Sequence, residues 1–468
     1  MGRYKKLSLN TLLFVLSNFG SKIVTLLLVP YYTYMLTTEQ YGTIDLLTTT
    51  LSLIIPVITL SISDAVLRFA IKSEFDHETV FTNGLVVCCL STVIVLLSVP
   101  FLRHISIFQG VELDFAILMI AQVFYQFFNQ FCRGIGSVKT VAISGFLTTL
   151  SMLILNIVFL TGMKMGVSGY FRALSLAYLI SILYQMFMKK IWRYVRVCKV
   201  NNAALKEMFV YCIPMIPNSI MWWITDASDK YMIAFFVGVS SNGIYALAKK
   251  IPSVLSMLHS VFFQAWQLSA VEESEAKDKG HYYSTVFNMF SCVMFLGISF
   301  VIFIIKPFLR VFVSEAYFSA WMYVPFLLIA VTFSSFSGFL GTNYVAMRET
   351  KGIFKTTVYG AISNIFLNAL LIPLFGMNGA SVATCISYVI TFWVRNRDTR
   401  KFVKIDYKVK YNTVCASLII LQIIVLFIFK NMISIITVEA LLFTAILVLS
   451  MYSYKDLMIS LFSKIRTR

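Results

Sequence analysis

Residues 9–72 read LNTLLFVLSNFGSKIVTLLLVPYYTYMLTTEQYGTIDLLTTTLSLIIPVITLSISDAVLRFAIK. Two long apolar segments lie on either side of a short polar turn at 36–41. Each segment is long enough to cross a bilayer as an α-helix, which takes about 20 residues. Lys22 lies in the middle of the first segment, and Asp45 and Asp64 lie toward the two ends of the second. Because a charge within a span costs at least about 2.5–3.5 kcal/mol, this hairpin predicts a helical bundle with a polar interior.

The composition of the whole chain predicts an integral membrane protein. Hydrophobic residues make up 59% of the 468 positions, only 13% are charged, and the mean hydropathy is +0.82. Water-soluble globular proteins do not have this composition. The net charge of +18 does not indicate a nucleic-acid partner, because the Lys and Arg residues fall in short loops between the apolar segments, where they set topology. The chain has no Walker motif and its cysteines lack metal-ligand spacing, so we expect no enzyme activity, cofactor or metal.

Apolar segments recur along the whole length and predict an all-α protein with fourteen transmembrane helices. They lie near 9–35, 42–66, 79–102, 115–132, 140–162, 167–188, 208–237, 241–270, 282–305, 316–346, 354–375, 378–394, 412–429 and 434–454. If the N-terminus is inside, the inner segments carry 29 Lys and Arg residues and the outer loops carry 5. This bias follows the positive-inside rule and predicts that both termini are cytoplasmic.

An internal repeat predicts two parallel halves. The stretch from Arg133 resembles the stretch from Arg348, with Gly169 matching Gly379 and Tyr178 matching Tyr388. Such repeats are common in membrane transporters. The predicted organisation is an N-terminal six-helix lobe (1–188), a basic cytoplasmic linker (189–207), a pseudo-symmetric C-terminal six-helix lobe (208–395), and a basic loop with two extra helices (396–468).

Five cations fall inside predicted spans and predict a cationic cavity. They are Lys22, Arg172, Lys230, Lys249 and Lys250. Lys and Arg there would bind a polyanionic headgroup such as a pyrophosphate. Arg172 has the alternative of snorkelling to the outer headgroups. The neighbouring Lys249 and Lys250 point about 100° apart on a helix, so we expect at most one of them to face a narrow cavity fully.

Carboxylates near these cations suggest ion pairs and a gate. Asp226 lies one helical turn before Lys230, with Asp229 beside it, so a structural ion pair competes with substrate contact there. Asp64 and Arg68 are one turn apart at the inner end of the second span, where an intrahelical pair would form part of a cytoplasmic gate. Kinks are also predicted at five of the prolines that fall within the predicted spans: Pro56, Pro214, Pro217, Pro252 and Pro325.

Several stretches together resemble the Wzx-type polysaccharide flippases of the multidrug/oligosaccharidyl-lipid/polysaccharide exporter superfamily. They are the first hairpin with the DAVLRF that follows it, SDKYMIAFFVG from Ser228, GIYALAKKIPSVL from Gly243 and FFQAWQLSA from Phe262. The resemblance implies two six-helix lobes around a central cavity, followed by two C-terminal helices. It also implies that an oligosaccharide on undecaprenyl pyrophosphate is moved across the bacterial cytoplasmic membrane by alternating access. Lys22, Asp229, Lys230, Lys249 and Lys250 lie in the matching motifs, whereas Arg172 does not.

Two alternatives stay open at this point: a flippase for the peptidoglycan precursor lipid II, and a cation-coupled multidrug antiporter of the same superfamily. The antiporters generally have twelve spans and need intramembrane carboxylates, which counts against the second alternative. The partners expected are the lipid-linked oligosaccharide, the bilayer and, as a candidate, a surface-polysaccharide polymerase complex.

Overall fold

The computed structural model describes residues 28–72, 75–273, 278–347 and 349–455. This part of the chain is helical and contains no β-strand, which confirms the predicted all-α class. It divides into two compact units, 1–231 and 232–468, each described separately here.

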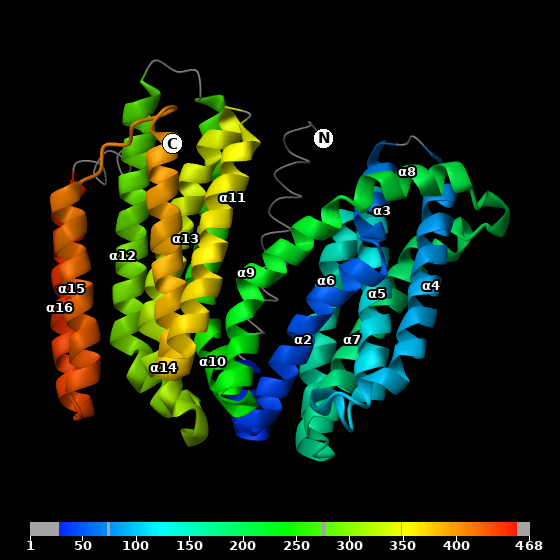
Figure 1. Cartoon of the computed structure of the whole chain (residues 1–468), viewed down its shortest axis with the longest axis horizontal. Coiled ribbons are helices and arrows are strands. Elements are labelled where there is room, and N and C mark those ends of the chain that lie inside the picture. Colours follow the sequence, from blue (N-terminus) through cyan, green and yellow to red (C-terminus); the bar gives the residue numbers. More distant parts are fainter. Residues whose placement is uncertain (1–27, 73–74, 274–277, 348, 456–468) are drawn as a thin grey trace. The chain divides into compact units, whose positions relative to one another are not determined.

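The first unit is formed by helices that mostly run lengthwise beside one another (Figure 1). They are α2 (Thr38–Ile58), α3 (Ile62–Lys72), α4 (His77–Leu102), α5 (Glu112–Gly134), α6 (Val138–Asn156), α7 (Gly166–Lys189), α8 (Asn202–Cys212) and most of α9 (Met215–Phe236). α8 crosses the ends of α3 and α4 and packs against both. Short helical turns at 191–194 and 197–199 belong to the predicted linker.

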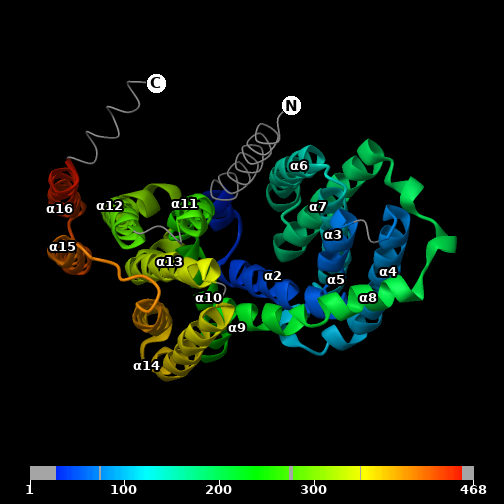
Figure 2. The same cartoon turned by 90° about the horizontal axis from the view of Figure 1, so that it is seen from above.

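The second unit contains α10 (Val239–Lys250), α11 (Ser253–Glu272), α12 (Lys279–Phe312), α13 (Val324–Ala346), α14 (Thr350–Thr399), α15 (Val409–Ile428) and α16 (Met432–Ser453). α15 and α16 lie side by side at the edge of this unit and both pack against α12 (Figure 2). These two helices are the predicted extra pair.

Local sequence signals explain where helices begin and end. α2 starts with a capping box: the Thr37 hydroxyl accepts from the Gln40 N–H and the Gln40 amide oxygen accepts from the Thr37 N–H, each at 3.1 Å. Pro214 lies between α8 and α9, and Pro252 lies between α10 and α11. Pro217 and Pro325 lie in the first turns of α9 and α13, where proline is tolerated.

The predicted second span, 42–66, is a broken helix. α2 ends at Ile58, two residues after Pro56, and α3 begins at Ile62. Leu60 and Ser61 between them have φ values of 49° and 54°, and the Ser61 N–H donates to the Pro56 carbonyl at 2.8 Å. The left-handed region costs non-glycine residues about 1–2 kcal/mol each, so this break must be held by the packing around it.

Ten of the described helices are long and apolar enough to cross a membrane. α14 is 50 residues long and is divided by Gly376, whose φ of 58° and ψ of −136° turn the chain. Its two segments correspond to the predicted spans 354–375 and 378–394. The helices together cover each predicted segment from 42–66 onward. Most of the first segment lies outside the described residues, so the count of fourteen stays a prediction.

The internal repeat is visible in the backbone. In the alignment that matches Gly169 with Gly379, Gly166 matches Gly376, and these two glycines have φ values of 56° and 58°. A Cβ on Gly169 would lie 2.9 Å from Met165 Cβ, and one on Gly379 would lie 2.1 Å from the Leu371 carbonyl oxygen. A glycine with positive φ therefore stands at the same place in both halves, where a residue with a Cβ would be strained.

Candidate functional site

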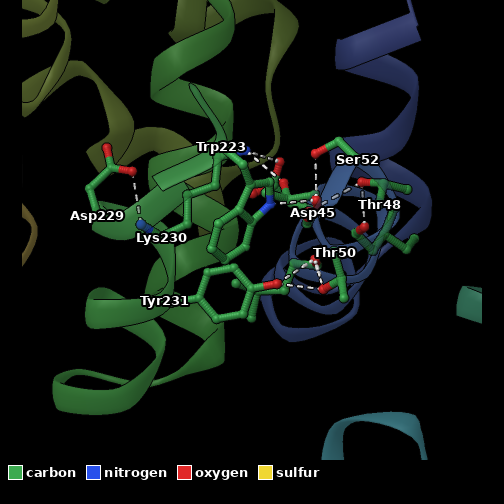
Figure 3. Close-up of polar contacts among 11 residues, drawn as sticks. Asp45, Thr48, Thr50, Ser52, Trp223, Asp229, Lys230 and Tyr231 are labelled. Carbon is green, nitrogen blue, oxygen red and sulfur yellow. Dashed lines mark hydrogen bonds and ion pairs between the residues drawn. The ribbon is translucent and has the colours of Figure 1, made fainter. Parts of the chain in front are cut away.

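An ion pair joins α2 to α9 within the first unit. The Lys230 ammonium on α9 donates to Asp45 Oδ1 on α2 at 3.0 Å, and the two side chains are only 12% and 13% exposed. Lys230 also donates to the Thr49 hydroxyl at 3.1 Å. Figure 3 shows the side chains of the two helices facing one another at this level. The pair lies inside predicted spans, so each charge depends on the other for its stabilisation.

Hydroxyl and aromatic groups surround this pair. The Trp223 indole N–H donates to the Thr49 carbonyl at 2.9 Å, and the Tyr231 hydroxyl is hydrogen-bonded to the Thr50 hydroxyl. The rings of Trp223 and Tyr231 are 5.2 Å apart. We name the set Asp45, Thr49, Thr50, Trp223, Lys230 and Tyr231 the α2–α9 polar network (Figure 3). It combines a charged pair, hydroxyls and aromatic faces, the groups that bind phosphate and sugar ligands.

The first unit holds a polar cavity of about 390 Å³ next to the break between α2 and α3. Asp64 and Arg133 line it together with Gln126, Asn129 and Gln130 of α5. The lining offers amide donors and acceptors beside one carboxylate and one guanidinium. Such a set can hydrogen-bond a hydroxyl-rich ligand.

Asp64 and Arg68 have different partners, although they lie one turn apart on α3. Arg68 stacks over the Tyr211 ring at 4.1 Å and lines a separate cavity of about 670 Å³ with Lys206 and Glu207. Asp64 instead faces the cavity that contains Arg133. In place of the predicted intrahelical pair, Arg68 contacts Tyr211 of α8, and Asp64 lines a cavity with Arg133 of α5.

Arg172 forms an ion pair with Asp114 of α5 at 2.8 Å, and its side chain is 50% exposed. The sequence predicted that Arg172 either faces a cavity or reaches the outer headgroups. Neither alternative included an ion pair with Asp114. The pair joins α7 to α5 inside the first unit.

The remaining predicted residues lie on several elements. Lys249 at the end of α10 has its ammonium 5.9 Å from the Tyr245 ring, and the Lys250 carbonyl accepts from the Ser253 hydroxyl. Asp229 is buried and accepts from the backbone N–H of Lys230, on the side of α9 away from Asp45 (Figure 3). Lys22 and the side chain of Asp226 lie outside the described residues.

Sequence reasoning placed Lys230 in an ion pair but named Asp226 as its partner. Among the described residues its carboxylate partner is Asp45, 185 positions earlier, and the expected pair with Asp226 stays a prediction. A signal was present, because Asp45 is a carboxylate inside a predicted span, and such groups usually pair. The network members Thr49, Thr50, Trp223 and Tyr231 were not predicted, since threonine and aromatic residues are common in membrane helices and carry no charge that marks them.

Residues 7–267 match the model of the polysaccharide biosynthesis protein family. The matched region covers more than half of the chain and includes the whole α2–α9 polar network. The chain belongs to this family. It is also 24% identical over 239 residues to a probable low-salt glycan biosynthesis flippase of Haloferax volcanii, which covers 49% of each chain. An uncharacterized membrane protein of Methanocaldococcus jannaschii is 20% identical over 403 residues, or 81% of this chain and 94% of the relative.

Solved structures with the same fold are transporters. A lipid II flippase in an inward closed conformation has a TM-score of 0.74 at 13% identity, covering 96% of this chain and all of that one. An inward-facing multidrug resistance transporter of the same superfamily has a TM-score of 0.65 at 14% identity, covering 81% and 95%. The chain is therefore a multi-pass membrane protein with the fold of this transporter superfamily, as the sequence predicted.

Proposed function

We propose that this protein is a flippase that moves an undecaprenyl-pyrophosphate-linked oligosaccharide across the bacterial cytoplasmic membrane by alternating access, for the synthesis of a cell-surface polysaccharide. The observation that carries the proposal is the family match over residues 7–267. The glycan flippase among the relatives supports the same substrate class. Both named relatives come from archaea. The general part of the proposal is therefore a substrate whose saccharide is linked to a polyprenyl lipid, and the specific part is that this lipid is the bacterial carrier undecaprenyl pyrophosphate.

The chemistry of the first unit agrees with a ligand that carries both phosphate and sugar. The α2–α9 polar network supplies hydroxyls and aromatic rings, positioned by the Asp45–Lys230 pair. The cavity near Asp64 supplies amides and a guanidinium. We assign the pyrophosphate to Lys22 together with one of the neighbouring Lys249 and Lys250. Lys230 and Arg172 already have carboxylate partners, so we assign them a positioning role.

The inner end of the first unit is the proposed gate. Arg68 attaches α3 to α8 through Tyr211, Asp64 lines a cavity with Arg133 of α5, and the break at Leu60–Ser61 separates α3 from α2. Movement of α3 against α8 would change the Arg68–Tyr211 contact, and movement against α5 would change the cavity that Asp64 and Arg133 line. We also propose that Asp226 and Asp229, two charged residues of α9, help to fix the position of α9.

Deletion of the gene in its host tests the function. The proposal expects surface polysaccharide to be lost and the lipid-linked oligosaccharide to accumulate, with both reversed when the gene is returned. Unchanged surface polysaccharide would contradict the proposal. Rescue of a strain depleted of its lipid II flippase would instead favour the peptidoglycan precursor, and drug sensitivity as the only phenotype would favour a multidrug antiporter.

Lys22 provides the test of the cationic cavity. We expect Lys22→Ala to abolish surface polysaccharide while the protein remains in the membrane at its normal level, because the predicted topology puts this cation near the midplane, too deep to snorkel to the headgroups. The matched control is Lys5→Ala, which removes a cation from the N-terminal segment that precedes the first span. Normal polysaccharide in the Lys22 variant would remove this residue from the proposed site.

A further inference from the structure

A second set of intramembrane polar groups lies in the second unit, between α12, α15 and α16. Glu439 of α16, Gln422 of α15 and Ser299 of α12 each have a relative exposure of 0%. Among the described residues, both carboxyl oxygens of Glu439, the amide oxygen of Gln422 and the hydroxyl of Ser299 have no hydrogen-bond partner. Four unpartnered polar atoms in one small region of a membrane bundle are costly.

These groups are neighbours. The Gln422 amide nitrogen donates to the Ser299 carbonyl at 3.4 Å, which leaves its amide oxygen unused. The same amide lies next to the Glu439 carboxyl. Lys306 of α12 is 7% exposed and acts electrostatically on Glu439. The ammonium of Lys306 is directed elsewhere, since it donates to the Leu426 carbonyl and lies 3.8 Å from the centre of the Trp321 ring.

An ionised Glu439 is poorly stabilised in this position. It would be an anion inside an apolar bundle, with neither carboxyl oxygen at hydrogen-bond distance from a partner. The Gln422 amide is a donor that lies near it, and Lys306 is a nearby cation whose ammonium is directed elsewhere. A protonated Glu439 is different, because its O–H can donate to the unused oxygen of Gln422 or Ser299. One added proton therefore removes the buried anion and satisfies an unpartnered acceptor at the same time.

We propose that Glu439, with Gln422 and Ser299 as hydrogen-bond partners and Lys306 as the neighbouring charge, is an intramembrane proton-binding site between α12, α15 and α16. The proton comes from water and returns to it, so no co-reactant is needed. A metal cation is disfavoured, since Lys306 would repel it and the four unpartnered oxygens are fewer than the six or more ligands that Mg²⁺ or Ca²⁺ takes.

The site lies in the outer half of the membrane under the predicted topology. Glu439 is seven residues from the start of α16, about 10 Å along the helix axis, and Lys306 is near the end of α12. Arg310 and Lys430 lie further out at the helix ends, and the titratable groups Cys292, Tyr411 and Cys415 lie toward the inner end. Lys306 is thus the charged group that faces Glu439 from the packed helices.

Proton occupancy changes the net charge of this contact. When Glu439 is ionised, the charges of Glu439 and Lys306 sum to zero. When Glu439 is protonated, the cluster carries the single positive charge of Lys306. The attraction between α16 and α12 therefore depends on the proton. This gives the two extra helices a role as a proton-responsive element on α12, and the inference stands whether or not the protein is a flippase.

Infrared spectroscopy of the purified full-length protein in lipid nanodiscs tests the site. At neutral pH, where exposed carboxyl groups are ionised, we expect the C=O stretch of a protonated carboxyl in the wild type. Glu439→Gln should remove the band, and the control Glu39→Gln, which changes an exposed carboxyl in the outer turn, should retain it. Lys306→Met should extend the band to higher pH, because loss of the nearby positive charge disfavours the ionised form.

Three results would overturn the proposal. The first is a wild type with no protonated-carboxyl band at neutral pH, which would mean a permanently ionised Glu439 paired with Lys306. The second is a band that persists in Glu439→Gln. The third is a band that Na⁺ removes at constant pH, which would indicate a metal-cation site. If Glu439→Gln does not fold, the shift in Lys306→Met carries the test alone, and an unchanged titration there contradicts the proposal.

Discussion

The Asp45–Lys230 pair shows, at the scale of single residues, how a membrane span accommodates charge. Both side chains are almost fully buried, and threonine hydroxyls and an indole complete the surroundings. A buried pair of this kind contributes little net stability compared with apolar residues of the same size, but either charge alone is strongly destabilising. The pair therefore fixes where α9 lies on α2.

Single substitutions of the pair should be more damaging than the double substitution. We expect Lys230→Ala or Asp45→Ala to lower stability by about 3–5 kcal/mol, because each leaves one buried charge unpaired, and Asp45→Leu with Lys230→Met to recover most of the loss. Denaturation of the purified protein measures this. The control is Lys401→Ala, which breaks an exposed pair with Glu349 and should change stability by less than about 1 kcal/mol. Equal losses in the single and double variants would contradict the pairing.

The ion pair between Lys199 of the linker and Asp76 is predicted to depend on pH. A hydrogen bond from Lys199 holds the pKa of Asp76 below its ordinary value, and the same bond raises the pKa of Lys199. The contact is therefore complete above the ordinary Asp pKa and is lost as pH falls through the lowered value. At the basic end it is lost as pH rises through the raised pKa of Lys199.

Hydrogen exchange at 195–201 measures this contact. Protection should fall at acidic pH in the wild type. Asp76→Ala should show low protection at all pH values, because it removes the ion pair with Lys199. The variant also loses the cap of α4, where Asp76 accepts from the Thr79 N–H at 3.3 Å. The control Glu207→Ala changes a neighbouring carboxyl on α8 and should keep the wild-type profile. The same pH profile in the Asp76 variant as in the wild type would show that this carboxyl is not the titrating group.

At the scale of helices, the sequence predicted which segments cross the membrane better than where each is interrupted. Pro214 and Pro252 marked real boundaries, because proline lacks the N–H that a helix needs. The break at Leu60–Ser61 lies four residues after Pro56, at two residues with no local preference for positive φ. Tertiary packing decides that conformation, so no local pattern could indicate it.

The matched glycines provide the test of the repeat. We expect Gly376→Ala to destabilise the protein by about 1–2 kcal/mol, because alanine is strained at φ 58°. Gly166→Ala should cost at least as much, since its Cβ would also lie 2.9 Å from Gln40 Nε2. Gly162→Ala is the control, as its Cβ would meet open space. Thermal stability of the purified variants gives the order, and equal effects at all three positions would show that the turn does not require glycine.

At the scale of the whole molecule, hydropathy and loop charge predicted the class and fold, and pairing between distant residues had to come from the structure. The predicted boundary between halves lies at 207–208, whereas the first compact unit extends to Tyr231. The reason is physical: Trp223, Lys230 and Tyr231 attach α9 to α2. Sequence separation hides such contacts, and the domain boundaries of 1–188, 208–395 and 396–468 stay predictions.

Cysteine accessibility tests the predicted topology. In a variant that lacks the eight native cysteines, cysteines at Thr38 and Ser241 should react with a membrane-impermeant reagent added outside the cell, because the outer turns carry few cations. Cysteines at Lys199 and Asn396 should react only after the membrane is opened. The reverse pattern would invert the orientation, and labelling of all four from outside would disprove the alternation of spans.

Transfer of the lipid-linked oligosaccharide in proteoliposomes tests the central claim most directly. The substrate is extracted from the host and placed with the purified protein, and its arrival in the opposite leaflet is followed with an enzyme that acts on the exposed saccharide. The account predicts protein-dependent transfer that is lost in Lys22→Ala and retained in the exposed-pair variant Lys401→Ala. Transfer of lipid II but not of the host's own lipid-linked oligosaccharide, or no transfer above protein-free vesicles, would contradict it.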